Sequence, residues 1–466
     1  MKKIASIFAL LCITIISVFA QKFPVDTLVF NGNPDSRVNF VIIGDGYLES
    51  QQGDFLEDAR KITDDLFRSS PFTEYKDYFN VFTISVPSNE EGAADDPSAL
   101  IDNYFGSTFN YAGIQRLLVP TRTNHILNVM ADNIPEYDQV IVVVNTTVYG
   151  GSGGQFATSS VNLAASEISI HEIGHSFAGL SDEYWAGSQY ARESPNMTRQ
   201  SSLDLVKWKN WVSDRSSEIR TYPHSVDPNW YKPHPNCKMQ FLGAEFCAVC
   251  KEQMIQSIYR RVAHVEAFSP VEGEVSGEVI QFDLSTIKPF PNTLNITWIL
   301  DEEEVGSNDT SYELNLSSLE GGSHDVKVII YDSTALDKRD RIYITQIEWQ
   351  IGTDLNSNLQ RRFLDRPKDD DNVVTSVSSS VSGVILKLYP NPTSDKIQFA
   401  YEGASEGKVK VSLMTLDGKE LLHKSFLMPA GGKINQTIDI AGLPSGIYLV
   451  AVDSGKLQKT FRINKK

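Results

Sequence analysis

The chain has 466 residues, enough for about three domains at the usual size of roughly 150 residues each. It carries 59 acidic against 42 basic residues, which gives a formal net charge of −17 at pH 7. A surface this acidic repels polyanions, so nucleic acid and anionic membranes are excluded as expected partners.

The first twenty residues predict export. Lys2 and Lys3 precede the apolar run from Ile4 to Val18, and the small residue Ala20 stands before Gln21. This order is typical of a signal peptide that is cleaved after residue 20. The run is short for a membrane span, and no other run reaches the necessary ~20 apolar residues. We therefore expect a secreted or cell-surface protein with no transmembrane span in its mature chain.

Short apolar runs alternate with a helical stretch in the next part of the chain. Strands are predicted at 41–47, 79–86 and 140–144, with a helix at 55–67 after the first of them. This alternation indicates an α/β sheet layer. The glycine-rich loop 150–154 follows; it lacks the Lys-Ser/Thr of a phosphate-binding loop, so we expect it to be a mobile rim of an active cleft.

The most informative motif is His171-Glu172-Ile173-Gly174-His175. Residues four apart lie on one face of a helix, so His171 and His175 can bind one metal ion, and Glu172 is placed to take a proton from a metal-bound water. Two partly buried, hydrogen-bonded histidines are the bland alternative. Gly179, which can end the helix with a positive φ, and Asp182, three residues later, favour the metal site.

Two histidines and a carboxylate with an open fourth position are typical of catalytic zinc, whereas structural zinc sites are closed by four protein ligands. We therefore expect one catalytic Zn²⁺, held by His171, His175 and Asp182. Zinc would lower the pKa of its water to roughly 7, and Glu172 would act as the general base and then pass the proton to the leaving amine.

The run from His171 to Tyr184 resembles the metzincin pattern HExxHxxGxxH/D with one extra residue before the glycine. That longer spacing is similar to the IgA-peptidase family of metallopeptidases, and the likeness extends over about residues 35 to 260. It implies a secreted zinc endopeptidase of metzincin-like fold, with Glu183 as the rival of Asp182 for third ligand. Family membership does not make immunoglobulin the substrate.

The resemblance also implies a methionine turn beneath the metal, for which Met239 is the candidate and Met254 the alternative; a core methionine is the ordinary interpretation. Cys237, Cys247 and Cys250 are an odd number of thiols. Cys237 paired with one of the other two would staple the loop beneath the zinc site. The alternative, a four-ligand structural zinc that includes His234, has a spacing that matches no strong finger pattern.

Composition changes after about residue 265. Alternating stretches such as 294–299 and 326–331 predict a small β-sandwich, and the Trp298 strand looks like an immunoglobulin-type module, although no cysteine pair brackets the tryptophan. Residues 353–383 are polar and poor in aromatic residues, which is typical of a linker. Within them, residues 369–371 lack the spacing of a calcium loop.

The last module is predicted to be all-β. It opens with the run 388–394, carries Asp417-Gly418 as a hairpin signal, and closes with the run 443–450. It resembles the C-terminal sorting domain of the type IX secretion system of Bacteroidota, which implies the secretion machinery as a partner. A second accessory sandwich is the alternative.

Together these patterns predict a multidomain fold: an α/β metzincin-like zinc peptidase domain, an immunoglobulin-like β-sandwich and an all-β sorting domain. The expected limits are 1–20 for the signal peptide, 21–265 for the peptidase, 266–352 for the sandwich, 353–383 for the linker and 384–466 for the sorting domain. The predicted function is hydrolysis of peptide bonds in a protein or peptide substrate. The alternatives are a catalytically retired surface protein that binds glycan or host protein, and a zinc amidase acting on a non-protein amide.

Overall fold

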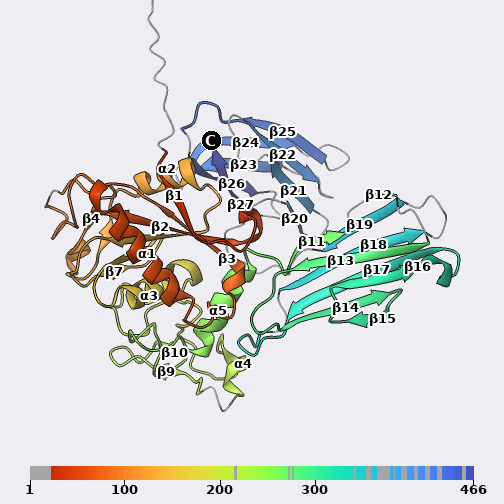
Figure 1. Cartoon of the computed structure of the whole chain (residues 1–466), viewed down its shortest axis with the longest axis horizontal. Helices are drawn as coiled ribbons and strands as arrows, with labels where there is room; N and C mark the ends of the chain where they lie inside the picture. Colours follow the sequence, from red (N-terminus) through yellow and green to blue (C-terminus); the bar gives the residue numbers. More distant parts are fainter. Residues whose placement is uncertain are drawn as a thin grey trace, which may run out of the picture.

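The computed structural model is a multidomain, mostly β-sheet protein with few helices, and three bodies are visible in it (Figure 1). The structure describes residues 22–99, 101–214, 218–270, 273–274, 278–339, 343–352, 358–364, 378–381, 384–389, 396–402, 408–414, 420–427, 433–444, 446–453 and 458–465. The predicted signal peptide lies outside these residues, as does most of the predicted linker. Among the described helices, none is long and apolar enough to cross a bilayer.

The first body is built on a six-stranded sheet in the order β1-β3-β2-β6-β8-β7. Its strands are β1 (Val25–Val29), β2 (Val38–Asp45), β3 (Phe79–Ile84), β6 (Gln139–Val144), β7 (Gly151–Ser152) and β8 (Ala157–Ser160). The four inner strands run parallel, and β1 and β7 pair antiparallel at the two edges. All residues of the inner strands are buried, as expected where both faces of a sheet are covered.

Helices cover both faces of this sheet. Alternate residues of β2 belong to two separate cores, because successive side chains of a strand point to opposite faces. One core includes side chains of α1 (Gln52–Leu66), α3 (Ala165–Ala178) and α5 (Ala248–Tyr259), and the other includes side chains of α2 (Thr123–Asn133). The predicted helix at 55–67 and the three predicted strands are thus found within a few residues of their expected limits.

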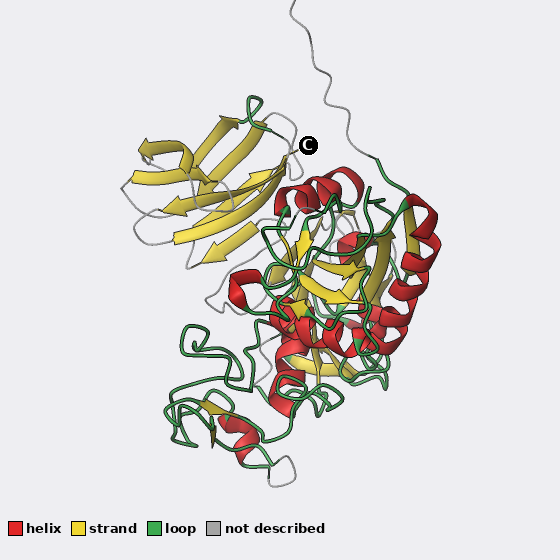
Figure 2. Ribbon diagram, turned by 90° about the vertical axis from the view of Figure 1, so that its left-hand side faces the viewer, coloured by secondary structure: helices red, strands yellow, loops and turns green. Residues whose placement is uncertain are grey.

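Between α3 and α5 the chain is mostly loop (Figure 2). The described regular elements there are the short helix α4 (Lys209–Val212) and the strand pair β9 (Tyr222–Pro223) and β10 (Tyr231–Lys232). Another two-stranded pair, β4 (Ser107–Thr108) with β5 (Val119–Pro120), lies before α2. These loops bring residues that are distant in sequence to α3. Lys238 contacts Glu167 and His171 of the helix, and Arg116 contacts Tyr184 in the segment after it.

The second body consists of two antiparallel sheets, β11-β13-β16 and β12-β19-β18-β17-β14-β15. Phe282, Trp298 and Trp349 come from both sheets and meet in one core. The strands are β11 (Val265–Ser269), β12 (Gly273–Glu274), β13 (Val279–Thr286), β14 (Leu294–Leu300), β15 (Glu303–Ser307), β16 (Ser311–Asn315), β17 (Ser323–Asp332), β18 (Ile344–Gly352) and β19 (Asn358–Leu364).

The third body has two four-stranded antiparallel sheets, β20-β21-β22-β25 and β24-β23-β26-β27, with one apolar core. The strands are β20 (Ser378–Val381), β21 (Val384–Tyr389), β22 (Lys396–Glu402), β23 (Lys408–Met414), β24 (Glu420–Leu427), β25 (Lys433–Asp439), β26 (Gly446–Asp453) and β27 (Gln458–Lys465). Two strands, β19 and β20, fall within the stretch expected to be linker. They are there because their backbones pair with β18 and β21.

Specific contacts join the first two bodies. The hydroxyls of Tyr75 and Tyr259 both donate to Asp332 Oδ2, the latter at 2.6 Å. The Tyr78 hydroxyl donates to the carbonyl of Ile287 at 2.6 Å. Buried hydrogen bonds to a charged group are among the stronger ones, so this junction fixes the second body against α5.

Candidate metal centre

Helix α3 carries the HExxH motif and ends as its sequence predicts. Gly179 adopts the left-handed conformation, with φ 67° and ψ 23°, and its amide donates to the carbonyl of His175 at 3.0 Å. A glycine adopts this conformation without the steric cost that a Cβ would add. The chain therefore turns sharply after the helix and returns toward it.

Three side chains converge on one point beside the helix. His171 Nε2 and His175 Nε2 lie 3.2 Å apart, and Asp182 Oδ1 lies 3.1 Å from the first and 3.2 Å from the second. Ligand atoms about 2.0–2.1 Å from a tetrahedral zinc ion are separated by roughly 3.3 Å. The three atoms thus form a nearly equilateral triangle of the size that a zinc ion requires, with one tetrahedral position open.

The other ring nitrogen of each histidine is held by a backbone carbonyl. His171 Nδ1 lies 2.9 Å from the oxygen of Lys238, and His175 Nδ1 lies 2.7 Å from that of Leu180. A carbonyl can only accept a hydrogen bond, so each Nδ1 carries the proton. This pattern orients both rings and directs both Nε2 atoms at the common centre, as outer partners do in metal sites.

The contacts within the triangle shift the pKa values of two of its members. Burial alone would lower the pKa of His175, but the hydrogen bond and charge of Asp182 outweigh it and raise this pKa to about 9. Burial likewise would raise the pKa of Asp182, yet the hydrogen bonds with His171 and His175 hold it below the ordinary value of 3.8. The site therefore stabilises positive charge at the point between the three atoms. A divalent cation carries twice the charge of a proton.

Glu172 lies beside this triangle and is mostly buried. Its Oε2 is 3.9 Å from His175 Nε2, farther than Asp182, so its carboxylate is close to the centre without closing the triangle. Burial raises the pKa of Glu172 above 4.5, and the charges of His171 and His175 offset part of that rise. A carboxylate with a raised pKa is a better proton acceptor near neutral pH.

The glycine loop contacts the centre directly. A Cβ on Gly153 would lie 2.4 Å from the Cβ of His175, and one on Gly151 would lie 3.2 Å from Glu172 Oε1. Both glycines are thus required by close approach of the backbone to the site. The sequence predicted this loop as a rim of the active cleft. In the structure its strand β7 lies against Glu172 of the candidate centre.

Met239 lies under the helix, as expected for the floor of the site. It is fully buried, and its Sδ would be 2.7 Å from a Cβ on Gly174, the residue before His175. Its carbonyl accepts from the amide of Glu183 at 2.8 Å. Met254 is buried too, but it lies on α5.

Two further residues of the site were given no role by the sequence, although Tyr184 closes the run that resembles the metzincin pattern. Arg116 Nη2 donates to the hydroxyl of Tyr184 at 3.1 Å, and the guanidinium lies 5.2 Å from the centre of that ring. Burial, followed by the charge of Asp182, raises the pKa of Tyr184, so the hydroxyl stays protonated. Both residues line one cavity with His171 and Glu172. Arg116 lies 55 positions before the motif, at a distance in sequence that no local pattern spans.

The structure separates the two candidates for third ligand. Asp182 faces the histidines, whereas Glu183 is buried against Asn196 and Cys250, with its Oε1 at 3.1 Å and 3.3 Å from them. The three cysteines are free, and Cys237 Sγ lies 3.7 Å from Cys250 Sγ, so the disulfide expected there is not formed in the structure. His234 is not part of the cysteine cluster, because its Nδ1 faces the carbonyl of Asn236.

Family comparisons agree with this geometry. Residues 27–229 match the family described as IgA Peptidase M64. The chain carries an M64 peptidase domain. Residues 387–466 match the secretion system C-terminal sorting domain. A peptidase domain implies a protein substrate, and the type IX sorting domain indicates a secreted or cell-surface protein that uses the type IX machinery. M64 peptidases are metallopeptidases, and the donor set of His171, His175 and Asp182 fits such a metal.

The chain has low similarity to other proteins in both sequence and structure. No curated protein sequence matches the chain. Among solved structures, latent dimeric PorU from Porphyromonas gingivalis is 12% identical with a TM-score of 0.17, and the match covers 43% of this chain and 20% of that one. Fibronectin(III)-like modules of Clostridium thermocellum CbhA are 15% identical with a TM-score of 0.12, covering 43% and 93%. Two fibronectin type III domains of chicken tenascin are 11% identical with a TM-score of 0.14, covering 43% and 99%.

Proposed function

We propose that this protein is a secreted zinc endopeptidase of metzincin-like fold. The proposal is supported above all by the triangle of His171 Nε2, His175 Nε2 and Asp182 Oδ1, whose sides of 3.1 to 3.2 Å suit one zinc ion. When bound, zinc would act as a Lewis acid that lowers the pKa of a water molecule to roughly 7 and polarises a substrate carbonyl.

The side chains around the metal have separate roles in this proposal. The Glu172 carboxylate accepts a proton from water in the cavity and returns it to the leaving amine. The Tyr184 hydroxyl accepts from Arg116 and lines the same cavity as Glu172, so in this proposal it donates to the carbonyl oxygen on which negative charge develops. The glycines of loop 150–154 let the loop backbone pack closely against His175 and Glu172, and so hold this wall of the site against α3.

We propose the same domain limits that the sequence predicts. The signal peptide would cover residues 1–20, the peptidase 21–265, an immunoglobulin-like sandwich 266–352, a linker 353–383 and the sorting domain 384–466. Within the linker stretch, β19 pairs with the second body and β20 with the third. The two-sheet core around Trp298 supports a sandwich as the second unit. It would act as a spacer that holds the peptidase away from the cell surface.

The test is the variant Glu172→Gln, which keeps the shape of the side chain and removes its basicity. Zinc content measured by mass spectrometry should be unchanged, while hydrolysis of casein or a peptide library should fall by roughly 10²–10⁴-fold. Glu57→Gln, an exposed change on α1, is the control and should match the parent protein. Retained turnover in Glu172→Gln would contradict the role of Glu172.

Two outcomes with the parent protein would favour the other functions. Stoichiometric zinc without cleavage of any peptide would favour a surface-binding protein on a peptidase scaffold. Cleavage of a non-protein amide alone, identified by the mass of the products, would favour an amidase.

A further inference from the structure

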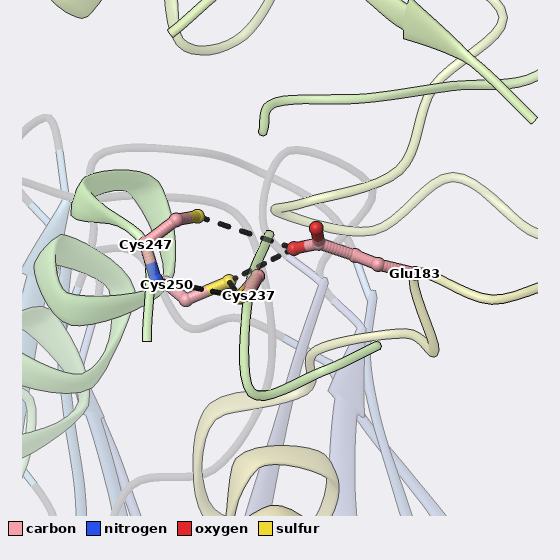
Figure 3. Close-up of side chains that lie close together, drawn as sticks. All are labelled: Glu183, Cys237, Cys247 and Cys250. Atoms are coloured by element: carbon pink, nitrogen blue, oxygen red, sulfur yellow. Dashed lines mark hydrogen bonds between the residues drawn. The ribbon is translucent and has the colours of Figure 1, made fainter. Parts of the chain in front are cut away.

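A second group of metal-binding side chains lies beneath the candidate metal centre. Cys237, Cys247, Cys250 and Glu183 bring one ligand atom each to a region in which all four atoms lie within 4.8 Å of one another. Figure 3 shows that they come from three segments: the loop after α3, the loop before α5, and the start of α5 itself. Cys237 and Cys250 are 0% exposed and Glu183 is 1% exposed.

The distances in this cluster suit a tetrahedral metal ion. Two thiolates each about 2.3 Å from zinc are separated by about 3.8 Å, and a thiolate and a carboxylate oxygen by about 3.5 Å. Here Cys237 Sγ lies 3.7 Å from Cys250 Sγ. Glu183 Oε1 lies 3.3 Å from Cys250 Sγ and 4.0 Å from Cys247 Sγ. No side chain has to move far for all four atoms to share one centre.

The cluster is poorly explained as ordinary core. A buried carboxylate is costly unless it is paired, and three thiols are weak hydrogen-bond donors. Glu183 Oε2 has no hydrogen-bond partner among the described residues. Lys232, which is buried nearby, can offset part of the negative charge that bound thiolates and a carboxylate would bring. A divalent cation would offset the remainder.

We propose that Glu183, Cys237, Cys247 and Cys250 bind a second zinc ion, which is structural. Four protein ligands leave no open position, and the burial of the cluster keeps water and substrate away. The CxxC pair at the start of a helix provides two of the ligands, and the two loops provide one each. The proposal does not depend on the proposed peptidase activity.

A zinc ion in this cluster would hold in place two segments that also contribute to the candidate metal centre. Glu183 adjoins Asp182, and Cys237 adjoins Lys238, whose carbonyl holds His171 Nδ1. The amide of Glu183 also donates to the carbonyl of Met239 at 2.8 Å. The second zinc would therefore fix the two loops that place the third ligand and orient the first histidine.

The experiment counts zinc in the full chain, purified without chelators and under mild reduction. We expect two zinc ions per chain in the parent protein and one in the folded double variant His171→Ala/His175→Ala. Adding Cys250→Ser to that double variant should remove the last ion. Folding of each variant is checked by circular dichroism.

Cobalt provides a second measurement in case Cys250→Ser does not fold. The double histidine variant loaded with Co²⁺ should show the intense near-ultraviolet absorption of thiolate-to-cobalt charge transfer, and a chelator should expose all three thiols to alkylation. The inference is overturned by a folded double variant that holds no metal, or by a disulfide between two of the cysteines in a parallel preparation of the parent protein purified without reductant. One zinc in the double variant together with an inactive parent protein would uphold this inference and contradict the proposed peptidase function.

Discussion

Asp182 and Glu183 are neighbours in the chain, yet their carboxylates belong to different clusters. Asp182 Oδ1 lies 3.1 Å from His171 Nε2, whereas Glu183 Oε1 lies 3.3 Å from Cys250 Sγ. The Asp182 side chain is directed toward the histidines of α3, and the Glu183 side chain toward Cys250 of α5. The segment after Gly179 therefore lies between the two candidate metal sites and links them through one peptide unit.

The variant Asp182→Ala should lose the catalytic zinc and keep the fold. Its side chain supplies one of three ligands, and even changes in the outer partners of a metal cost about 10–100-fold in affinity. We expect zinc affinity at this site to fall by at least about 100-fold and hydrolysis to fall with it. Asp204→Ala, an exposed change, is the control. Unchanged zinc binding, measured by competition with a chromogenic chelator, would remove Asp182 from the ligand set.

The variant Gly153→Ala should reduce activity without unfolding the protein. The added methyl group would lie 2.4 Å from the Cβ of His175, so either the loop or the histidine must move. A displacement of about 1 Å near reacting groups can cost on the order of 100-fold in rate. Gly53→Ala on α1, where an added Cβ meets nothing within 4 Å, should leave turnover unchanged. Equal turnover in both variants would show that the loop lies outside the working site.

The variant Tyr184→Phe tests the role of the hydroxyl that Arg116 holds. The ring and its contact with the guanidinium remain, and only the proton donor is lost. If the hydroxyl stabilises developing charge, kcat should fall by about 10²-fold or more while KM changes little. A rise in KM with constant kcat would assign Tyr184 to substrate binding instead.

Asp337 should make stability depend on pH at the junction of the first two bodies. Burial and the nearby charge of Glu252 raise its pKa from 3.8 to about 7. The folded protein then retains a proton that the unfolded chain releases above about pH 4, so the free energy of unfolding should decrease between pH 4 and 7. Asp337→Asn removes this decrease in the free energy of unfolding, and its side-chain oxygen can still accept from the amide of Arg339.

We expect Asp337→Asn to be more stable than the parent protein by about 1–2 kcal/mol at pH 8, with allowance for solvent screening, and to match it near pH 4. Thermal unfolding at the two pH values measures the difference. Asp309→Asn, an exposed change in the second body, is the control. A stability advantage that is the same at both pH values would show that the charge of Asp337 is not its cause.

Much of the first body could be predicted because its signals are local. The strands at 41–47, 79–86 and 140–144 are apolar enough to be recognised as buried, and the helix spacing of His171 and His175 places both rings on one face. Gly179 signals the end of α3 for the same local reason. The strands β19 and β20 were not predicted, because their sequences are polar and their backbone pairing with β18 and β21 has no signal within the segments.

The sequence alone predicted His171 and His175 as metal ligands, with Glu172 beside them, and where the helix that carries them stops. Only the tertiary structure decided between Asp182 and Glu183, placed Arg116 beside Tyr184, and replaced the expected disulfide by a cluster of three cysteines and a glutamate. The physical reason is the range of the interactions. Backbone torsions and helical spacing act over a few residues, whereas the packing of loops against α3 and α5 joins residues that are more than fifty positions apart.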